Sequence, residues 1–214
     1  MAKKPWGREV LLAESAFVAC WLLDIKAGHS TSLHSHPNTL TGYIVVEGSL
    51  RLSFLNGHQN LTALDKVVIH RAVPHRSTGL TDCKLIEIQC PKDHNDIIRF
   101  EDDYGRAGEP MDMAAEPSNF DFSADLELEG GITIGRRKIA PGFAYFEWLD
   151  SLPDGVAIAV LSGYFINSDN RAGIVPGHVD WSRDLKRLTG EGKVLVLDAP
   201  LDVLIAWDGR PKQI

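Results

Sequence analysis

The chain has 214 residues, 44% of them hydrophobic and 24% charged, which is typical of a globular protein with one large domain or two small ones. Its net charge of −7 argues against nucleic-acid and anionic-membrane partners, because both need a basic surface. No apolar stretch approaches the ~20 residues of a membrane span, and no apolar run follows Lys3 and Lys4 as it would in a signal peptide.

Short strand-like segments dominate the first hundred residues. Apolar and β-branched runs that are typical of strands occupy residues 17–25, 43–46, 50–54, 66–69 and 84–89. The dipeptide Asn56-Gly57 is a strong hairpin signal. Turn signals recur at roughly 8–12-residue intervals and no long helical period is present, so we predict an all-β barrel or sandwich.

Three histidines are arranged in this region as a metal site would require. His34 and His36 form an H-x-H pair in a strand-like segment, and His75 follows a later turn after Pro74. Residues i and i+2 of a strand point to the same face, so the pair directs two imidazoles into one cavity. A third imidazole from another strand would complete a site suited to Zn, Fe, Ni, Cu or Mn.

The second half of the chain repeats the first in outline. Gly28 and Gly48 are separated by 20 residues, and Gly142 and Gly163 by 21, each pair flanking strand-like runs. This favours an internal duplication, with residues 1–106 as a metal-binding barrel, 107–131 as an acidic, turn-rich connector and 132–214 as a second, degenerate β domain. A single barrel with an unrelated β extension is the alternative.

The repeat also predicts which barrel holds a metal. Positions equivalent to the H-x-H pair carry Trp148 and Asp150 in the second half. Neither a tryptophan nor a lone aspartate replaces an imidazole pair as a ligand set. We therefore expect the second domain to bind no metal and to have a structural role.

These motifs resemble the two sequence motifs of the cupin superfamily. Gly28, His34, His36 and Gly48 fit the first motif, and Pro74-His75 fits the end of the second. The resemblance implies a double-stranded β-helix barrel. Thr41 stands where the first motif usually has a glutamate, so the implied metal site has three histidines and no carboxylate.

A narrower resemblance covers about residues 4–106. The segments 4–7, 86–89 and 96–106, the last with the sequence Asp-Tyr-Gly-Arg at its end, resemble the cupin domain of type II mannose-6-phosphate isomerases. This resemblance implies a divalent metal, whose identity among Zn, Fe, Mn and Ni is open, and interconversion of aldose and ketose phosphates. The expected function is therefore that of a sugar or sugar-phosphate isomerase.

Candidate residues for this chemistry lie on the strand at 84–89 and among the arginines. Period-2 alternation places Glu87 and Gln89 on one face, either toward solvent or toward the cavity. If that face is the cavity, Glu87 is the best general-base candidate. We expect Gln89 and Thr41 to contact the substrate and Arg76 and Arg106 to bind its phosphate, because a guanidinium matches phosphate oxygens bidentately.

Two other functions fit the same sequence. The missing glutamate favours a mononuclear iron dioxygenase, because the dioxygenase branch of the cupins has such three-histidine sets. The degenerate second half favours a non-catalytic carbohydrate-binding or regulatory protein. In each case we expect a small-molecule ligand, a homodimer and, because Cys20, Cys83 and Cys90 lack C-x-x-C spacing, a cytoplasmic protein with free thiols.

Overall fold

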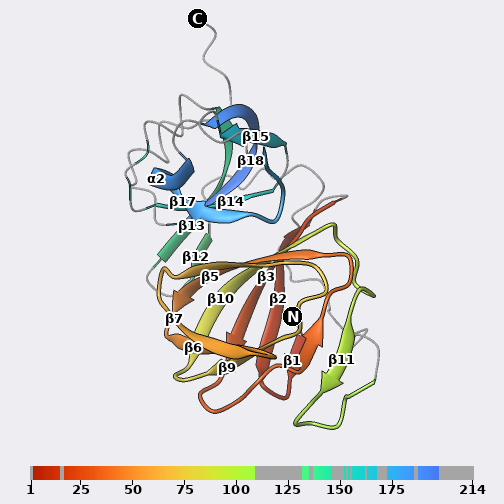
Figure 1. Ribbon diagram of the computed structural model, residues 1–214. Helices are drawn as coiled ribbons and strands as arrows, with labels where there is room; N and C mark the ends of the chain where they lie inside the picture. Colours follow the sequence, from red (N-terminus) through yellow and green to blue (C-terminus); the bar gives the residue numbers. More distant parts are fainter. Residues whose placement is uncertain are drawn as a thin grey trace, which may run out of the picture. The chain divides into compact units, whose positions relative to one another are not determined.

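The computed structural model describes residues 2–14 and 17–108, and in the C-terminal part residues 132–134, 137–145, 152, 154, 156–161, 163–167, 173–185 and 188–197. The chain divides into two compact units, residues 1–125 and 126–214. Both units are built mainly from antiparallel strands (Figure 1). This confirms the prediction of an all-β protein.

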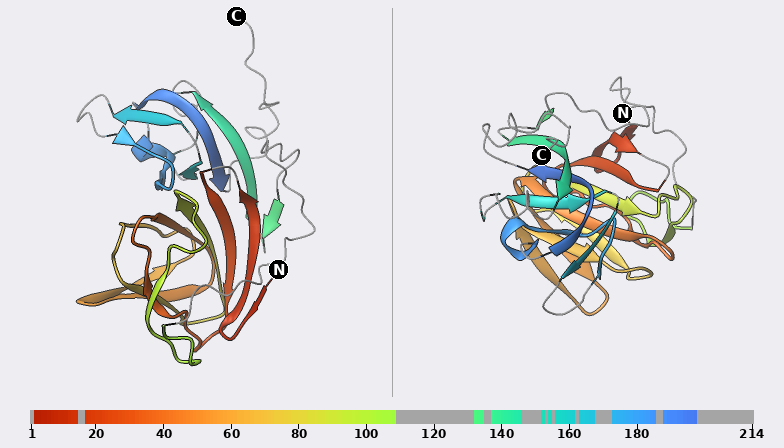
Figure 2. Two further views of the ribbon diagram at one scale, coloured as in Figure 1. Left: turned by 90° about the vertical axis from the view of Figure 1, so that its right-hand side faces the viewer. Right: turned by 90° about the horizontal axis from the view of Figure 1, so that it is seen from above.

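The first unit consists of two antiparallel sheets that face each other as the two layers of a barrel (Figures 1 and 2). The six-stranded sheet has the order β1 (Ala2–Lys4), β2 (Gly7–Glu14), β3 (Ala19–Ile25), β10 (Cys83–Cys90), β5 (Leu40–Glu47) and β8 (Lys66–Ile69). The five-stranded sheet has the order β11 (Ile98–Glu101), β4 (Leu33–Ser35), β9 (His75–Gly79), β6 (Ser49–Phe54) and β7 (Gly57–Thr62).

The strands alternate between core and solvent as period-2 patterning requires. In β6, Leu50 and Leu52 are fully buried while Arg51 between them is exposed. These leucines pack in one hydrophobic cluster with Leu23 and Leu85 of the opposite sheet. The core therefore lies between the two sheets and joins them into one barrel.

The β6–β7 hairpin is present but its turn differs in detail from the prediction. The turn is formed by Leu55 and Asn56, and Gly57 already pairs with Phe54 as the first residue of β7. A two-residue type I′ turn would have had Asn56 and Gly57 at its centre. The hairpin was thus predicted correctly, with its turn one residue too late.

The second unit has one sheet whose main path is β12 (Ile132–Ile134), β13 (Arg137–Tyr145), β18 (Leu188–Leu197), β14 (Ala157–Val160) and β17 (Val179–Trp181). Beside this path, β15 (Tyr164–Asn167) pairs with β16 (Gly173–Ile174) and with the start of β18. A single short helix, α2 (Ser182–Leu185), is present among the described residues of this unit. Its core includes Ile158, Phe165, Leu185 and Val196.

Some predictions for the C-terminal part lie outside the described residues. These are the equivalents of the H-x-H pair, Trp148 and Asp150, and most of the connector at 107–131. None of the described helices has the length and apolar character that a membrane crossing requires.

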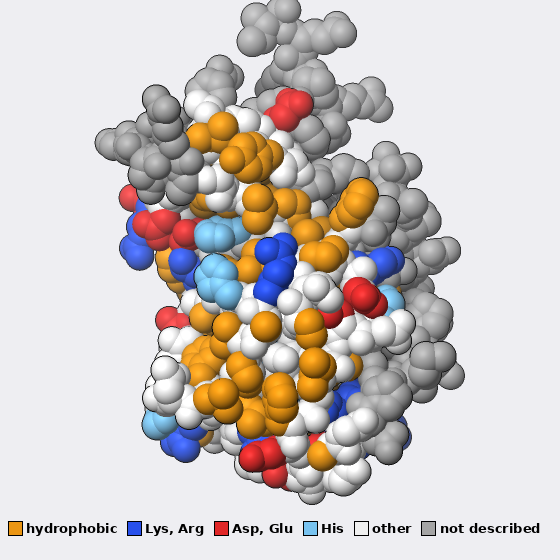
Figure 3. All heavy atoms as spheres, turned by 45° about the vertical axis from the view of Figure 1, so that its right-hand side comes forward, with side chains coloured by type: hydrophobic (Ala, Val, Ile, Leu, Met, Phe, Trp, Pro, Cys, Tyr) orange, Lys and Arg blue, Asp and Glu red, His pale blue; other side chains and the backbone are white. Residues whose placement is uncertain are grey.

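Several large hydrophobic side chains of the first unit stay exposed, among them Phe17, Leu55, Ile98 and Phe100. On the face of the molecule in Figure 3, hydrophobic side chains lie next to one another with charged side chains around them. Single exposed apolar residues are common on protein surfaces.

The exposed side chains Ile98 and Phe100 alternate along β11 with the buried Arg99, which therefore points into the barrel.

Candidate metal centre and its pocket

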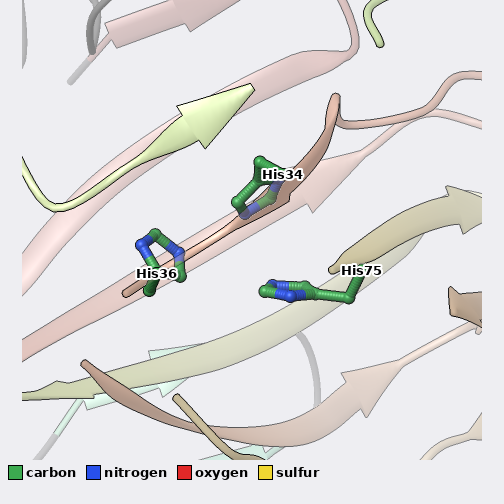
Figure 4. A group of neighbouring side chains, drawn as sticks. All are labelled: His34, His36 and His75. Carbon is green, nitrogen blue, oxygen red and sulfur yellow. The ribbon is translucent and has the colours of Figure 1, made fainter. Parts of the chain in front are cut away.

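The three predicted histidines meet inside the barrel of the first unit. His34 lies on β4, His36 follows one residue after the end of that strand, and His75 is the first residue of β9. The antiparallel register pairs His34 directly with His75. Potential ligand atoms of the three imidazoles all lie within 4.8 Å of one another, and the rings converge on a common point (Figure 4).

Each imidazole is held by a main-chain carbonyl. The Nδ1 atoms lie 2.8 Å from the Ser32 oxygen for His34, 2.6 Å from the Asp96 oxygen for His36 and 2.9 Å from the Val73 oxygen for His75. A carbonyl oxygen can only accept a hydrogen bond, so each Nδ1 carries the proton and each Nε2 presents a lone pair. The same tautomer is the one that metal-bound histidines adopt.

The environment keeps the three rings neutral. Burial lowers the pKa of all three histidines, most strongly for His34, and brings that of His75 to about 4. The neighbouring imidazoles lower the pKa of His34 further. At neutral pH the cluster is therefore deprotonated and competent to bind a cation without first releasing protons.

Two of the three Nε2 atoms are in an environment that a bound metal ion would stabilise. The Nε2 atoms of His36 and His75 are buried and have no hydrogen-bond partner among the described residues. A buried polar atom without a partner is costly. Three neutral nitrogen donors with further positions open suit Zn, Fe, Ni, Cu or Mn. The residues present therefore fit a divalent metal ion.

His34 and His36 line an open pocket of about 600 Å³, a volume that includes the space at its mouth. Glu87 and Gln89 of β10 and Tyr43 of β5 also line it. The face of β10 that carries Glu87 is thus the cavity face, which the sequence had left open. The basic residues on the pocket wall are Lys4, Arg99 and Arg106.

Glu87 is a buried carboxyl group in this pocket. Burial raises its pKa to about 8, and the nearby Glu9 carboxylate adds to the effect. A hydrogen bond of 2.9 Å from the Gln89 amide to Glu87 Oε1 acts in the opposite direction. The group is therefore mostly protonated at pH 7, in a range where it can both donate and accept a proton.

Acidic partners hold two of the basic residues. Lys4 Nζ lies 3.2 Å from Glu9 Oε2, and Arg106 Nε and Nη2 each lie 2.9 Å from a carboxylate oxygen of Asp102. From the sequence, Lys4 was identified only as part of the segment 4–7 that resembles the isomerases, and Glu9 was not identified. Their place in the pocket depends on the β1–β2 hairpin, in which Lys4 pairs with Gly7, and no local motif signals it.

Two predicted substrate contacts, Arg76 and Thr41, are not among the residues that line the pocket. Arg76 is within 3.6 Å of Glu101 and 3.7 Å of Asp103, and Thr41 is buried in the sheet between Gln89 and Ile69. Gln89 and Arg106, by contrast, do line the pocket, and their contacts with a substrate stay a prediction.

Comparison of the sequence with protein-family models and with curated proteins finds no match. Among solved structures, the chain is similar to KdgF from Halomonas sp. at 17% identity and a TM-score of 0.42, over 44% of this chain and 87% of that one. It is similar to a cupin-2 domain containing protein from Shewanella frigidimarina at 25% identity and a TM-score of 0.36, over 39% and 79% of the two chains.

A sugar phosphate isomerase from a cupin superfamily, from Silicibacter pomeroyi, is also similar, at 17% identity and a TM-score of 0.34. That match covers 36% of this chain and 52% of the other. The two facing antiparallel sheets of the first unit agree with the barrel that the sequence resemblance implies.

Proposed function

We propose that this protein is a metal-dependent isomerase of small phosphorylated sugars. The observation that carries the proposal is the cluster of three histidines, of which His34 and His36 line the pocket that also holds the buried Glu87 carboxyl group. Aldose–ketose exchange needs a polarised carbonyl oxygen and a group that moves protons next to it. Both requirements have a candidate in this one pocket.

His34, His36 and His75 would hold the ion, which when bound would act as a Lewis acid toward a sugar oxygen. Glu87 would exchange protons with the substrate, since its pKa of about 8 lies close to neutral pH. Gln89 would orient that carboxyl group through its hydrogen bond. Arg106 and Lys4 would attract the phosphate group, with Asp102 and Glu9 fixing their positions.

An iron dioxygenase is the second candidate, and the donor set favours it. Among the described residues, the group that could hold a metal ion consists of three histidines and includes no carboxylate. With only neutral ligands the site would keep the full charge of its ion, and two or more positions would stay open for substrate and O₂. A non-catalytic carbohydrate-binding or regulatory protein is the third candidate.

We also propose that the second unit is a diverged repeat of the first. The strand order β12-β13-β18-β14-β17 corresponds one for one to β2-β3-β10-β5-β8. Gly163 before β15 has a φ of 90°, as Gly48 before β6 has a φ of 75°. In both cases an added Cβ would collide with a main-chain carbonyl, that of Glu191 or Asp82. These correspondences support the duplication that the glycine spacing predicts.

The function is tested by deuterium exchange at the sugar C2, followed by NMR after addition of Zn²⁺, Mn²⁺, Ni²⁺ or Fe²⁺, with mannose 6-phosphate as the first substrate. We expect metal-dependent exchange in the wild type. Arg106→Met should raise KM about 10–100-fold by removing a charge-assisted contact. Arg51→Met, at an exposed position of β6, is the matched control and should leave KM unchanged.

The same experiment also defines the results that would contradict the isomerase proposal. Absence of C2 exchange across hexose and pentose phosphates with every metal would exclude the isomerase. Uptake of O₂ by the iron-loaded protein in the presence of an organic substrate would then establish the dioxygenase in its place.

A further inference from the structure

Arg106 reaches the pocket from a turn, residues 102–106, that follows the end of β11 at Glu101. The turn is closed by its own contacts. The buried side chain of Asp102 accepts hydrogen bonds from the main-chain nitrogen of Arg106 at 3.3 Å and from its Nε and Nη2 atoms at 2.9 Å each. Both partners lie within the turn, so these bonds fix its internal shape but not its place on the barrel.

Tyr104 connects this turn to a second segment of the first unit. Its hydroxyl oxygen lies 3.0 Å from Nδ1 of His29 and accepts a hydrogen bond of 3.5 Å from the main-chain nitrogen of Ser30. The Tyr104 ring packs against the hydrophobic core and stacks with the His29 ring, with the centroids 6.3 Å apart and the planes 11° from parallel. Thr31 and Ser32, the next two residues of that segment, line the pocket.

The same aromatic ring supports the guanidinium group. Arg106 Cζ lies over the Tyr104 ring, 5.6 Å from its centroid, within the range of a cation–π interaction. Asp102 holds the guanidinium group by one edge and Tyr104 by one face. The bidentate pair fixes the direction of the group in its own plane, and the ring limits its tilt out of that plane.

A further attachment of the turn is weaker. The exposed carboxylate of Asp103 lies 3.7 Å from Arg76, and an ion pair of this kind contributes little because solvent screens it. We therefore attribute the placement of the turn chiefly to Tyr104.

We propose that Tyr104 is a positioning residue that holds Arg106 at a fixed place on the pocket wall, where the guanidinium group binds an anionic group of the ligand. The proposal rests on the proposed function, in which that anion is the phosphate of a sugar. Tyr104 does not line the pocket and acts through Arg106 alone. The segment that it contacts also contains Ser32, whose carbonyl group orients His34. The anion-binding residue and the histidine cluster therefore share one support, which favours ligands of one length.

The proposal is tested by titrating the full-length, chelator-treated protein with inorganic phosphate and following the amide NMR signals of Thr31 and Ser32. We expect Tyr104→Leu, which removes both the aromatic face and the hydroxyl group, to raise the Kd about 10-fold. Tyr104→Phe keeps the ring and loses only the hydrogen bonds, so its Kd should rise about 2–5-fold.

A double-mutant cycle separates positioning from a general structural effect. In the background of Arg106→Met, Tyr104→Leu should raise the Kd no further, because the residue through which it acts is already lost. Phe100→Leu is the matched control. It removes an exposed aromatic side chain two residues before the turn and should leave the Kd unchanged.

His29→Ala covers the risk that Tyr104→Leu unfolds the protein, because His29 is exposed and the Tyr104 ring stays packed on the core. Its Kd should rise about 2–5-fold, as in Tyr104→Phe. An unchanged Kd in Tyr104→Leu, or in both other variants where that one does not fold, overturns the inference.

Two other results also overturn it. One is a wild type that binds no phosphate, and the other is a full additional rise in Kd when Tyr104→Leu is added to Arg106→Met. A Kd that rises in the Tyr104 variants only when Arg106 is present, together with absent C2 exchange in the wild type, supports the positioning role and contradicts only the isomerase function.

Discussion

The buried carboxyl group of Glu87 gives a definite prediction for the dependence of stability on pH. Its pKa is raised from 4.5 to about 8 in the folded state. Between these two values the folded protein retains a proton that the unfolded chain releases. The free energy of unfolding must therefore fall as pH rises through this window, and Glu87→Gln should remove that dependence.

The magnitude follows from comparing the wild type with Glu87→Gln between pH 6.5 and 8. The lowered pKa values of the three histidines act in the opposite direction, since they stabilise the folded state as the pH rises past 6.5, but this contribution is the same in both proteins and cancels in the comparison. From pH 6.5 to 8, Glu87 alone should cost about 2 kcal/mol, at 1.36 kcal/mol for each pH unit. Glu87→Gln should lose almost none of this.

Urea unfolding of the chelator-treated protein at pH 6.5, 7.25 and 8 measures the effect. The indole NMR signals of Trp6 and Trp21, both buried in the first unit, report on that unit separately from the second. Equal pH slopes in the wild type and Glu87→Gln would refute the argument that Glu87 is buried and protonated. A slope that is present in the wild type and absent in the variant supports it.

Two further predictions concern the metal and a glycine turn. His75→Ala should reduce metal affinity more than ~100-fold, which exceeds the effect of losing a group that only orients a ligand. The control His58→Ala, at an exposed position, should leave the affinity unchanged. Equal metal content by elemental analysis in the wild type and both variants would contradict the site. Gly48→Ala should lower stability more than Gly105→Ala in urea unfolding. Both glycines have positive φ, at 75° and 82°, but only at Gly48 would the new Cβ collide with a carbonyl, so equal losses would show that backbone strain alone decides.

The cluster of three histidines could be predicted because its geometry follows from local rules. The i, i+2 spacing of His34 and His36 determines that both rings share a face, whichever way the strand is turned. The same parity rule argues against Arg76 as a pocket residue, because it follows His75 directly in β9 and must point to the opposite face.

Other features depend on tertiary structure and could not be read from the sequence. Alternation in β10 shows that Glu87 and Gln89 share a face, but only the second sheet determines that this face is the cavity. Lys4 and Glu9 reach the pocket because a terminal hairpin adds to the sheet edge beside β3. The pairing that does so joins the neighbouring strands β2 and β3, but periodicity gives only the face of each residue within a strand and not which strands pair.

The main-chain anchors of the three imidazoles affect how this site can change over evolutionary time. The acceptors belong to Ser32, Val73 and Asp96, and every residue type carries the same carbonyl group. Substitution at these three positions therefore leaves the acceptors in place, whereas a carboxylate anchor would disappear with its side chain. The side chains of the pocket wall can diversify toward new substrates while the ligand nitrogens keep their orientation, so one ancestral metal site can give rise to several specificities.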